Sequence, residues 1–208
     1  MKRLAIIGAG DLGQLIAHHA TGSFDVVGFF DDFAEGNISI NGKPILGTLS
    51  EIQSQFEANI FDELIVAIGY KHMSFRAKVY DTYSNSIPMA SVIHASCFID
   101  KSSKIGKGVC LLPGSILDRN SVIHDNVLVN VGCTIAHDSV VKRHSFLSPS
   151  VAIAGFVEIG ARCVIGINST VIDNITIADD IRTGGGAVVI DSLQESGLYV
   201  GNPSRFVK

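Results

Sequence analysis

The sequence predicts an α/β unit over residues 1–86, followed by a parallel β-solenoid with a C-terminal tail over residues 87–208. Three observations predict this fold class. Short apolar runs alternate with longer mixed segments before residue 86, a glycine-rich turn follows the first run, and a six-residue repeat continues from Ile93 to Val188. The two halves therefore have different sequence patterns, and we predict one domain in each.

Three apolar runs in the first domain are expected to be strands. They are Leu4 to Ile7, Val26 to Phe30 and Leu64 to Ile68, and the segments between them indicate a βαβαβα order. The first run leads directly into Gly8-Ala9-Gly10-Asp11-Leu12-Gly13, and the segment from Gln14 to Thr21 is a plausible helix. A GxGxxG motif between a strand and a helix is typical of a Rossmann-like nucleotide-binding unit.

The glycine-rich turn predicts a nucleotide site. Glycines let a backbone approach a diphosphate at a helix N-terminus, where free N–H groups favour anions. The second strand ends at Asp31 and Asp32, near where an acidic side chain would meet a ribose hydroxyl. About 85 residues supply only half of a doubly wound sheet, so a mononucleotide with a short appendage fits better than a dinucleotide. The alternative is a turn that only packs the helix on the strand.

Sixteen consecutive hexads open on an aliphatic residue, with Thr183 as the one exception. The residue four positions further on is small or β-branched in every hexad. A helix would smear a six-residue spacing around its axis, whereas short strands separated by tight corners preserve it. The openers are Ile93, Ile99, Ile105, Leu111, Leu117, Ile123, Val129, Ile135, Val141, Leu147, Ile153, Ile159, Ile165, Val171, Ile177 and Thr183. The repeat therefore predicts a β-solenoid.

Corners are expected three residues after each opener, where a left-handed backbone favours Gly, Asn or Asp. Ten hexads have one of these residues there: Gly108, Gly114, Asn120, Asn126, Gly132, Asp138, Asn168, Asn174, Asp180 and Gly186. Three hexads per coil would make a triangular prism whose core contains the openers and their small partners. Residues eighteen apart would then lie directly above one another, as in the row Arg119, His137, Gly155 and Asp173.

Composition narrows the functional classes. The chain has 208 residues, is 47% hydrophobic and carries a net charge of −4 without a Lys/Arg run, so nucleic acid and anionic membranes are not expected partners. No signal peptide and no run of eighteen apolar residues is visible, and we expect a cytoplasmic protein. The four cysteines form no CxxC pair, and no three histidines converge as a zinc site requires. We therefore expect no metal.

His137 is the leading catalytic candidate in the prism. It lies beside a corner, where its imidazole would be available to take a proton, and the adjacent Asp138 could orient it. Gly155, one coil further on, leaves room for an acyl thioester. Asp138 also occupies a corner position that demands Asn, Asp or Gly, so it could be present for its backbone alone. Cys133 is at an interior position, which argues against an acyl-cysteine intermediate.

The order of these motifs resembles one family of enzymes. The motifs are the short nucleotide-binding domain, the β-helix, His137-Asp138, Gly155, the segments 166–169 and 184–189, and Val200-Gly201-Asn202-Pro203-Ser204-Arg205. They are similar to the sialic acid O-acetyltransferase and nucleotide-amino-sugar N-acetyltransferase family of hexapeptide-repeat acyltransferases. The resemblance implies a left-handed parallel β-helix, a homotrimer, acetyl-CoA in the groove between neighbouring β-helices, and a nucleotide-linked amino sugar on the N-terminal domain.

The resemblance also implies residue roles. His137 would be the general base and Asp138 its support, while Gly155 would bound the acyl pocket. The acetyl-CoA groove would be lined by Ile167, Gly185, Gly201, Asn202 and Pro203, with Phe146 standing where relatives commonly have a second histidine. The nucleotide would be held by Gly8, Gly10, Gly13, Asp31 and Asp32, with Gly69 at its edge. Leu12 also departs from the family, because some relatives have a histidine there. Residues Glu35 to Pro44 and Lys71 to Phe75 are expected to edge the nucleotide pocket.

Three functions remain open at this stage. The first is N-acetylation of a nucleotide-linked 4-amino-4,6-dideoxy sugar for a surface glycan, such as an O-antigen. The second is O-acetylation of a sialic acid or related sugar, which predicts no binding of a nucleotide diphosphate. The third is a non-catalytic sugar-nucleotide-binding trimer, in which His137→Ala would leave function intact. The nucleotide base and the sugar stereochemistry are not encoded in any of these motifs.

Overall fold

The structure is a computed structural model, and it describes residues 1–34 and 39–208. These residues separate into two compact units, Met1–Val92 and Ile93–Lys208, and each is described by itself. The first unit extends six residues beyond the expected boundary at residue 86. The reason is that the Leu64 N–H donates to the Pro88 carbonyl at 2.9 Å, while the Ala90 N–H donates to the Leu64 carbonyl at 2.7 Å.

The first unit is an α/β sheet with the predicted order of elements. Its strands are β1 (Arg3–Ile7), β2 (Asp25–Phe30), β3 (Ser39–Ile40), β4 (Lys43–Gly47) and β5 (Glu63–Val66). Its helices are α1 (Asp11–Ala20), α2 (Ile52–Glu57) and α3 (Met73–Tyr83), with short 3-10 turns at Leu49–Glu51 and Tyr70–His72. The sheet order is β3-β4-β2-β1-β5, in which only the β3–β4 pair is antiparallel.

The predicted strands and helix of this unit are confirmed, with shifted ends. Strands β3 and β4 are additions to the prediction, and helix α1 begins at Asp11, three residues before the expected start at Gln14. The earlier start arises because Gly10 is the N-cap, and its carbonyl accepts the Gln14 N–H at 3.0 Å. The second half of the glycine-rich motif, Asp11 to Gly13, therefore belongs to the first turn of the helix.

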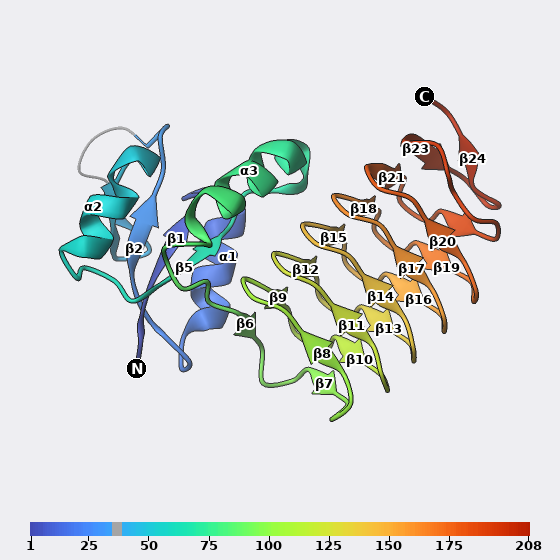
Figure 1. The fold of residues 1–208 in the computed structure, drawn as a ribbon, viewed down its shortest axis with the longest axis horizontal. Coiled ribbons are helices and arrows are strands. Elements are labelled where there is room, and N and C mark those ends of the chain that lie inside the picture. Colours follow the sequence, from blue (N-terminus) through green and yellow to red (C-terminus); the bar gives the residue numbers. More distant parts are fainter. Residues whose placement is uncertain (35–38) are drawn as a thin grey trace. The chain divides into compact units, whose positions relative to one another are not determined.

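The second unit is the predicted β-solenoid, built from three parallel sheets with a short antiparallel C-terminal strand (Figure 1). Sheet I contains β6 (Val92–Ile93), β9 (Cys110–Leu111), β12 (Leu128–Val129), β15 (Phe146–Leu147), β18 (Val164–Ile165), β21 (Ile181–Thr183), β23 (Gly197–Val200) and β24 (Arg205–Phe206). Sheet II contains β7 (Phe98–Ile99), β10 (Ile116–Leu117), β13 (Thr134–Ile135), β16 (Ala152–Ile153), β19 (Thr170–Val171) and β22 (Val188–Val189). Sheet III contains β8 (Lys104–Ile105), β11 (Val122–Ile123), β14 (Val140–Val141), β17 (Glu158–Ile159) and β20 (Thr176–Ile177).

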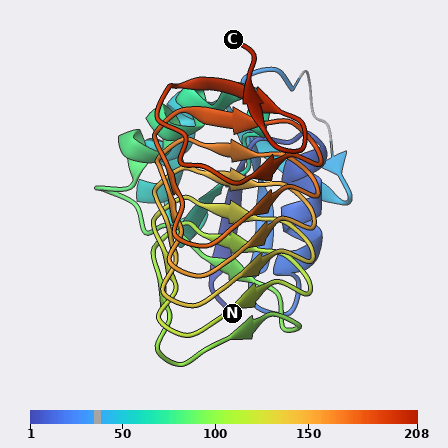
Figure 2. The ribbon, with the colours of Figure 1, turned by 90° about the vertical axis from the view of Figure 1, so that its right-hand side faces the viewer.

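Strands eighteen residues apart pair in register, as the three-hexad coil predicts. Leu117 pairs with Ile135, which pairs with Ile153, which pairs with Val171. Figure 2 shows the successive coils lying one behind another. Each corner residue therefore has a counterpart eighteen positions away on the next coil.

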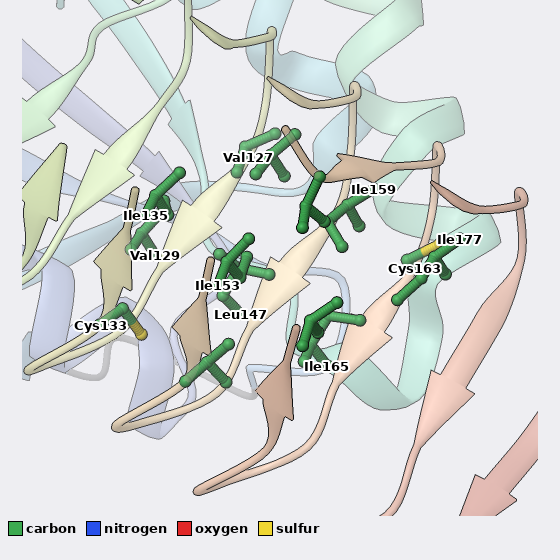
Figure 3. Close-up of a cluster of buried hydrophobic side chains, with 14 of the residues drawn as sticks. Val127, Val129, Cys133, Ile135, Leu147, Ile153, Ile159, Cys163, Ile165 and Ile177 are labelled. Carbon is green, nitrogen blue, oxygen red and sulfur yellow. The ribbon is translucent and has the colours of Figure 1, made fainter. Parts of the chain in front are cut away.

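The interior of the prism is filled by the hexad openers and their small partners. All openers from Leu111 to Thr183 are buried, and those in the middle coils point into the same apolar core (Figure 3). Interior serines bond to the carbonyl of the next coil, as Ser139 Oγ does to the Ala154 carbonyl at 2.8 Å. The exceptional opener Thr183 accepts the Gly166 N–H at 2.8 Å, so its hydroxyl is satisfied.

All ten predicted corners have the left-handed backbone expected of them, with φ between +54° and +74°. Four further hexads adopt the same conformation without the favoured residue types, at His144, Ser150, Phe156 and Arg162. Because all fourteen share one place in the repeat, the prism imposes this conformation on whatever residue stands there. A residue with a Cβ and no short amide or carboxylate bears a steric cost at such a position.

Candidate active site

His137 lies in the corner between β13 of sheet II and β14 of sheet III. Its Nδ1 is 3.0 Å from Asp138 Oδ2, and its side chain is 42% exposed. Because a carboxylate only accepts hydrogen bonds, this contact assigns the proton to Nδ1 and leaves a lone pair on Nε2. The structure gives Nε2 no hydrogen-bond partner among the described residues. The imidazole is therefore oriented with Nε2 able to accept a proton.

Asp138 combines the two roles that the sequence left open. Its φ of +59° makes it a corner residue, while its carboxylate contacts the imidazole. The same carboxylate accepts from Asn120 Nδ2 at 2.9 Å and from an Arg119 guanidinium nitrogen at 3.3 Å. The hydrogen bond from Asn120, followed by that from His137, lowers the pKa of Asp138 below its usual range. The carboxylate is therefore held ionised beside the imidazole.

Gly155 and Phe156 complete the surroundings of the imidazole. A Cβ added at Gly155 would lie 2.7 Å from His137 Cε1 and 2.9 Å from Nε2, so the imidazole occupies the space that a side chain would fill. The Phe156 ring meets the imidazole edge to face, with centroids 5.2 Å apart and planes at 84°. Sequence reasoning missed Phe156, although its place after Gly155 in the repeat could have indicated it.

The residues expected to line the acetyl-CoA groove gather mostly at another corner row, between sheets I and II. The Gly186 N–H donates to the Ile167 carbonyl at 2.7 Å, and the Val188 N–H donates to the Gly201 carbonyl at 3.0 Å. The turn that contains Asn202 and Pro203, joined by a cis peptide bond, follows Gly201 directly. Phe146 lies apart from this row, because it is part of β15 and its side chain is only 5% exposed.

The nucleotide site predicted for the first unit coincides with a cavity of about 460 Å³. Five of the six expected residues line it, namely Gly8, Gly10, Asp31, Asp32 and Gly69. Gly13 does not line it, because Gly13 packs against the first turn of the motif. The cavity therefore opens over the glycine-rich turn and the N-terminus of α1.

Each position of the motif is suited to glycine for a different physical reason. Gly8 has a φ of +103°, and a Cβ there would lie 2.9 Å from the Ala67 carbonyl oxygen. A Cβ at Gly13 would lie 1.9 Å from the Gly8 carbonyl oxygen, so this glycine allows close packing of helix on strand. A Cβ at Gly10 would meet nothing within 4 Å, which leaves this backbone open to a diphosphate. The three roles agree with those of a nucleotide-binding turn.

The two acidic residues of the cavity also hold its loops. Asp31 Oδ2 accepts the Ala9 N–H at 2.8 Å, while Oδ1 accepts the Phe33 N–H at 2.9 Å. Asp32 Oδ1 accepts the Leu49 N–H at 2.8 Å. These carboxylates thus fix the glycine-rich turn and the neighbouring loops in addition to any contact with a ribose.

Of the two segments expected at the rim of the cavity, one contributes lining residues and the described part of the other does not. His72 and Phe75 line it, as predicted for the segment from Lys71 to Phe75. Residues 35–38 of the other segment lie outside the described residues, and the rest of that segment was wrongly predicted. Ile40, Asn41 and Lys43 instead line a separate cavity beside α1, because β3 and β4 form the edge hairpin of the sheet. Phe33 and Leu49 also line the nucleotide cavity and were not predicted.

The cysteines are placed as interior residues rather than nucleophiles. Cys133 is fully buried, its Sγ donates to the Ser148 carbonyl at 3.1 Å, and burial raises its pKa to about 11. Burial likewise raises the pKa of Cys163 to about 12.

Across residues 1–34 and 39–208, no three His, Cys, Asp or Glu side chains gather as a metal would require. In the same residues, no helix has both the length and the apolar character needed to cross a bilayer.

The fold and the site together define a class. An α/β unit with a cavity over a glycine-rich turn, followed by a hexapeptide β-helix with a His–carboxylate pair at one corner, is the architecture found in β-helix acyltransferases. Comparison with known proteins makes this class more specific. Residues 3–83 match the family described as the PglD N-terminal domain.

Several solved structures match the whole chain, and two of them come from different organisms. One is a histidine-to-alanine mutant of GDP-perosamine N-acetyltransferase from Caulobacter crescentus, in complex with CoA and GDP-perosamine. It is 26% identical and has a TM-score of 0.94, covering 100% of this chain and 98% of that chain. The other is the acetyltransferase domain of PglB from Neisseria gonorrhoeae, 26% identical with a TM-score of 0.91 and complete coverage of both chains.

Curated relatives match a shorter stretch. The UDP-3-O-acylglucosamine N-acyltransferase of Delftia acidovorans is 33% identical over 98 residues, which is 47% of this chain and 29% of that protein. The chain thus spans less than a third of the length of this relative. Taken with the whole-chain structural matches, these findings show that the chain is similar to hexapeptide-repeat acyltransferases and has the left-handed parallel β-helix fold of the matched enzymes.

Proposed function

We propose that the protein is an acetyl-CoA-dependent N-acetyltransferase whose acceptor is a nucleotide-linked 4-amino-4,6-dideoxy sugar. The single observation that carries this proposal is the His137 imidazole, which is bonded to Asp138 through Nδ1 and lies against Gly155. A base of this kind, in a chain that also has a nucleotide-type cavity, fits acyl transfer to a sugar nucleotide. The Caulobacter enzyme, which matches along the whole chain and is bound to CoA and GDP-perosamine, supports the same acceptor and donor classes, and the Neisseria acetyltransferase domain supports the transferred acetyl group.

The chemistry needs one base and no acyl-enzyme intermediate. The acceptor nitrogen attacks the thioester carbonyl, so that a C–N bond forms and the C–S bond breaks. His137 Nε2 takes the proton that the nitrogen releases, and this proton leaves with the departing thiol. Asp138 stabilises the imidazolium while it carries the proton, because its carboxylate stays ionised. The direct route agrees with the buried, protonated thiol of Cys133.

The binding roles follow from the two glycine-rich regions. Gly10 and the first turn of α1 would take the diphosphate, and Asp31 or Asp32 the ribose. Acetyl-CoA would lie along the corner row that contains Ile167 and Gly185. A Cβ at Gly185 would lie 3.0 Å from Ile167 Cγ2. The row therefore leaves space for a bound molecule beside Ile167 because residue 185 has no side chain. A homotrimer, in which this groove lies between neighbouring β-helices, and a role in surface glycan synthesis belong to the same proposal.

The decisive experiment measures thiol release from acetyl-CoA with UDP-, dTDP- and GDP-linked 4-amino sugars and with free sialic acid. We expect one nucleotide amino sugar to be acetylated, and His137→Ala to lose most of that rate. His124→Ala is the matched control, because His124 is an exposed histidine at a different corner row. Acetylation of the free sugar acid alone would favour an O-acetyltransferase. A complete lack of turnover with intact nucleotide-sugar binding would favour a binding protein.

A further inference from the structure

Phe156 is the one apolar residue with a left-handed backbone among the described non-glycine residues. Its φ is +58°, in a corner position where other hexads have Gly, Asn or Asp. The three other disfavoured corners are His144, Ser150 and Arg162, and two of them have evident local partners. Arg162 forms two hydrogen bonds with Asp180 at 2.6 and 2.7 Å, and His144 is buried beside Asn126.

The side chain of Phe156 is not accounted for by the prism core. It is 57% exposed, and the ring contact that the structure gives it is with His137. An exposed aromatic ring gains little from burial, yet it is kept in a conformation that a Cβ disfavours. A residue held at a steric cost beside a catalytic group points to a role at the site.

The chemistry of the acceptor indicates what an apolar ring beside the base would contact. His137 Nε2 must reach the amine on C4 of the sugar. On a pyranose ring, C4 has two neighbours, C3 with its hydroxyl and C5 with its exocyclic carbon. A flat apolar surface next to the base suits the exocyclic carbon when that carbon is a methyl group. A hydroxymethyl group would lose water from its hydroxyl without gaining a partner on phenylalanine.

We propose that Phe156 is a specificity-determining residue, which forms the wall against which the C5 methyl group of the acceptor packs. It thereby selects a 4-amino-4,6-dideoxy sugar over the matched 4-amino sugar that carries a hydroxymethyl group. This inference rests on the proposed function, and it names the substrate feature that the same site reads. An apolar pocket discriminates against an added hydroxyl by at most about 100-fold. The expected preference is therefore roughly 10- to 100-fold in kcat/KM.

The test compares kcat/KM for the two nucleotide sugars in the wild type and in three variants. Phe156→Asn removes the ring and suits the left-handed corner, so we expect the preference for the methyl sugar to fall at least fivefold. Phe156→Tyr keeps the ring and should keep the preference. Arg162→Asn is the control for replacing a disfavoured corner residue, because Arg162 lies in a different corner row, between β17 of sheet III and β18 of sheet I. The sugar preference of this variant should equal that of the wild type. The melting temperature of Phe156→Asn should not fall.

Four results would overturn the inference. The first is an unchanged preference in Phe156→Asn, and the second is a changed KM for acetyl-CoA with an unchanged preference. The third is a lower molecular mass of Phe156→Asn in sedimentation, which would make the ring an assembly contact. If the wild type acetylates neither sugar, the proposed function fails. The role of Phe156 is then tested separately, by measuring the calorimetric affinities of the wild type and of Phe156→Asn for both sugars. Equal affinity ratios in the two proteins are the fourth.

Discussion

The His137 imidazole lies where the side chain of residue 155 would be if that residue were not glycine. A Cβ on Gly155 would approach Cε1 to 2.7 Å and Nδ1 to 3.2 Å. The two residues are on adjacent coils, and the Phe156 N–H donates to the His137 carbonyl at 3.2 Å, which keeps the coils in register. The orientation of the His137 imidazole therefore depends on the absence of a side chain at residue 155 as well as on Asp138.

Gly155→Ala should lower kcat/KM by about 100-fold, the order of loss expected when a catalytic group is displaced by about 1 Å. The protein should remain folded, because the new methyl group meets the end of a side chain that can rotate away. Gly160→Ala is the informative contrast, since its Cβ would lie 2.5 Å from the backbone carbon of Ala178. That variant should lose stability in thermal unfolding instead. Unchanged kinetics of Gly155→Ala would contradict the proposed packing.

Asp138→Asn should reduce kcat at least tenfold, which corresponds to about 1.4 kcal/mol. Asparagine keeps the left-handed corner but can donate to Nδ1, which would place the proton on Nε2 and disable the base. Asp180→Asn is the control, because Asp180 is a corner residue with a φ of +60° in another row. Equal rates for the two variants and the wild type would reduce Asp138 to a corner residue.

Cys133→Ala should retain the transfer rate, because the proposed reaction passes through no acyl-cysteine. The variant should lose about 1 kcal/mol of unfolding free energy, the cost of removing one buried methylene-sized group. In the wild type, burial raises the pKa of Cys133 to about 11, so the thiol stays protonated at pH 8. Alkylation of the folded protein at Cys133, followed by mass spectrometry, should be negligible until denaturant is added. Loss of turnover in the folded alanine variant would revive the covalent route.

The contact between Asp62 and Arg3 should make the stability of the first unit depend on pH in the acid range. The Asp62 carboxylate bonds to the Arg3 guanidinium at 2.6 Å and to the Arg3 N–H at 2.8 Å, and these contacts lower its pKa to about 2. A lowered folded-state pKa stabilises the protein above the unfolded value of about 3.9, and this contribution is lost as the pH falls towards 2. Urea unfolding should show Asp62→Asn to be less stable than the wild type at pH 7. The difference should shrink at pH 2, and a constant difference would exclude this linkage.

The repeat allowed the prism to be predicted in detail, because its period determines both the interior positions and the strand register. Ile135 and Ile153 are buried and paired as the eighteen-residue coil requires. The corners at Phe156 and Arg162 could not be predicted from residue type, since both side chains disfavour a positive φ. There the closed geometry of the coil overrides the local preference of the residue.

The candidate site was predictable where chemistry depends on sequence neighbours. His137 and Asp138 are adjacent in the chain, so their contact follows from one corner. The contacts of Asp138 with Arg119 and Asn120 join neighbouring coils, and they depend on side-chain directions that a pattern of residue types does not contain. Phe33 and Leu49 line the cavity over the glycine-rich turn from the loop after β2 and from the 3-10 turn Leu49–Glu51, and neither position follows from the strand pattern.

The eighteen-residue coil also determines how distances within the prism can change. Each coil advances the prism by one strand spacing, about 4.8 Å. The axial separation between the corner of His137 and the turn at Gly201 is therefore quantised. Inserting or deleting a whole coil would lengthen or shorten it by that step while every interior residue kept its facing neighbours. A donor molecule that spanned the distance from the turn at Gly201 to His137 would therefore need a length that matches a whole number of coils.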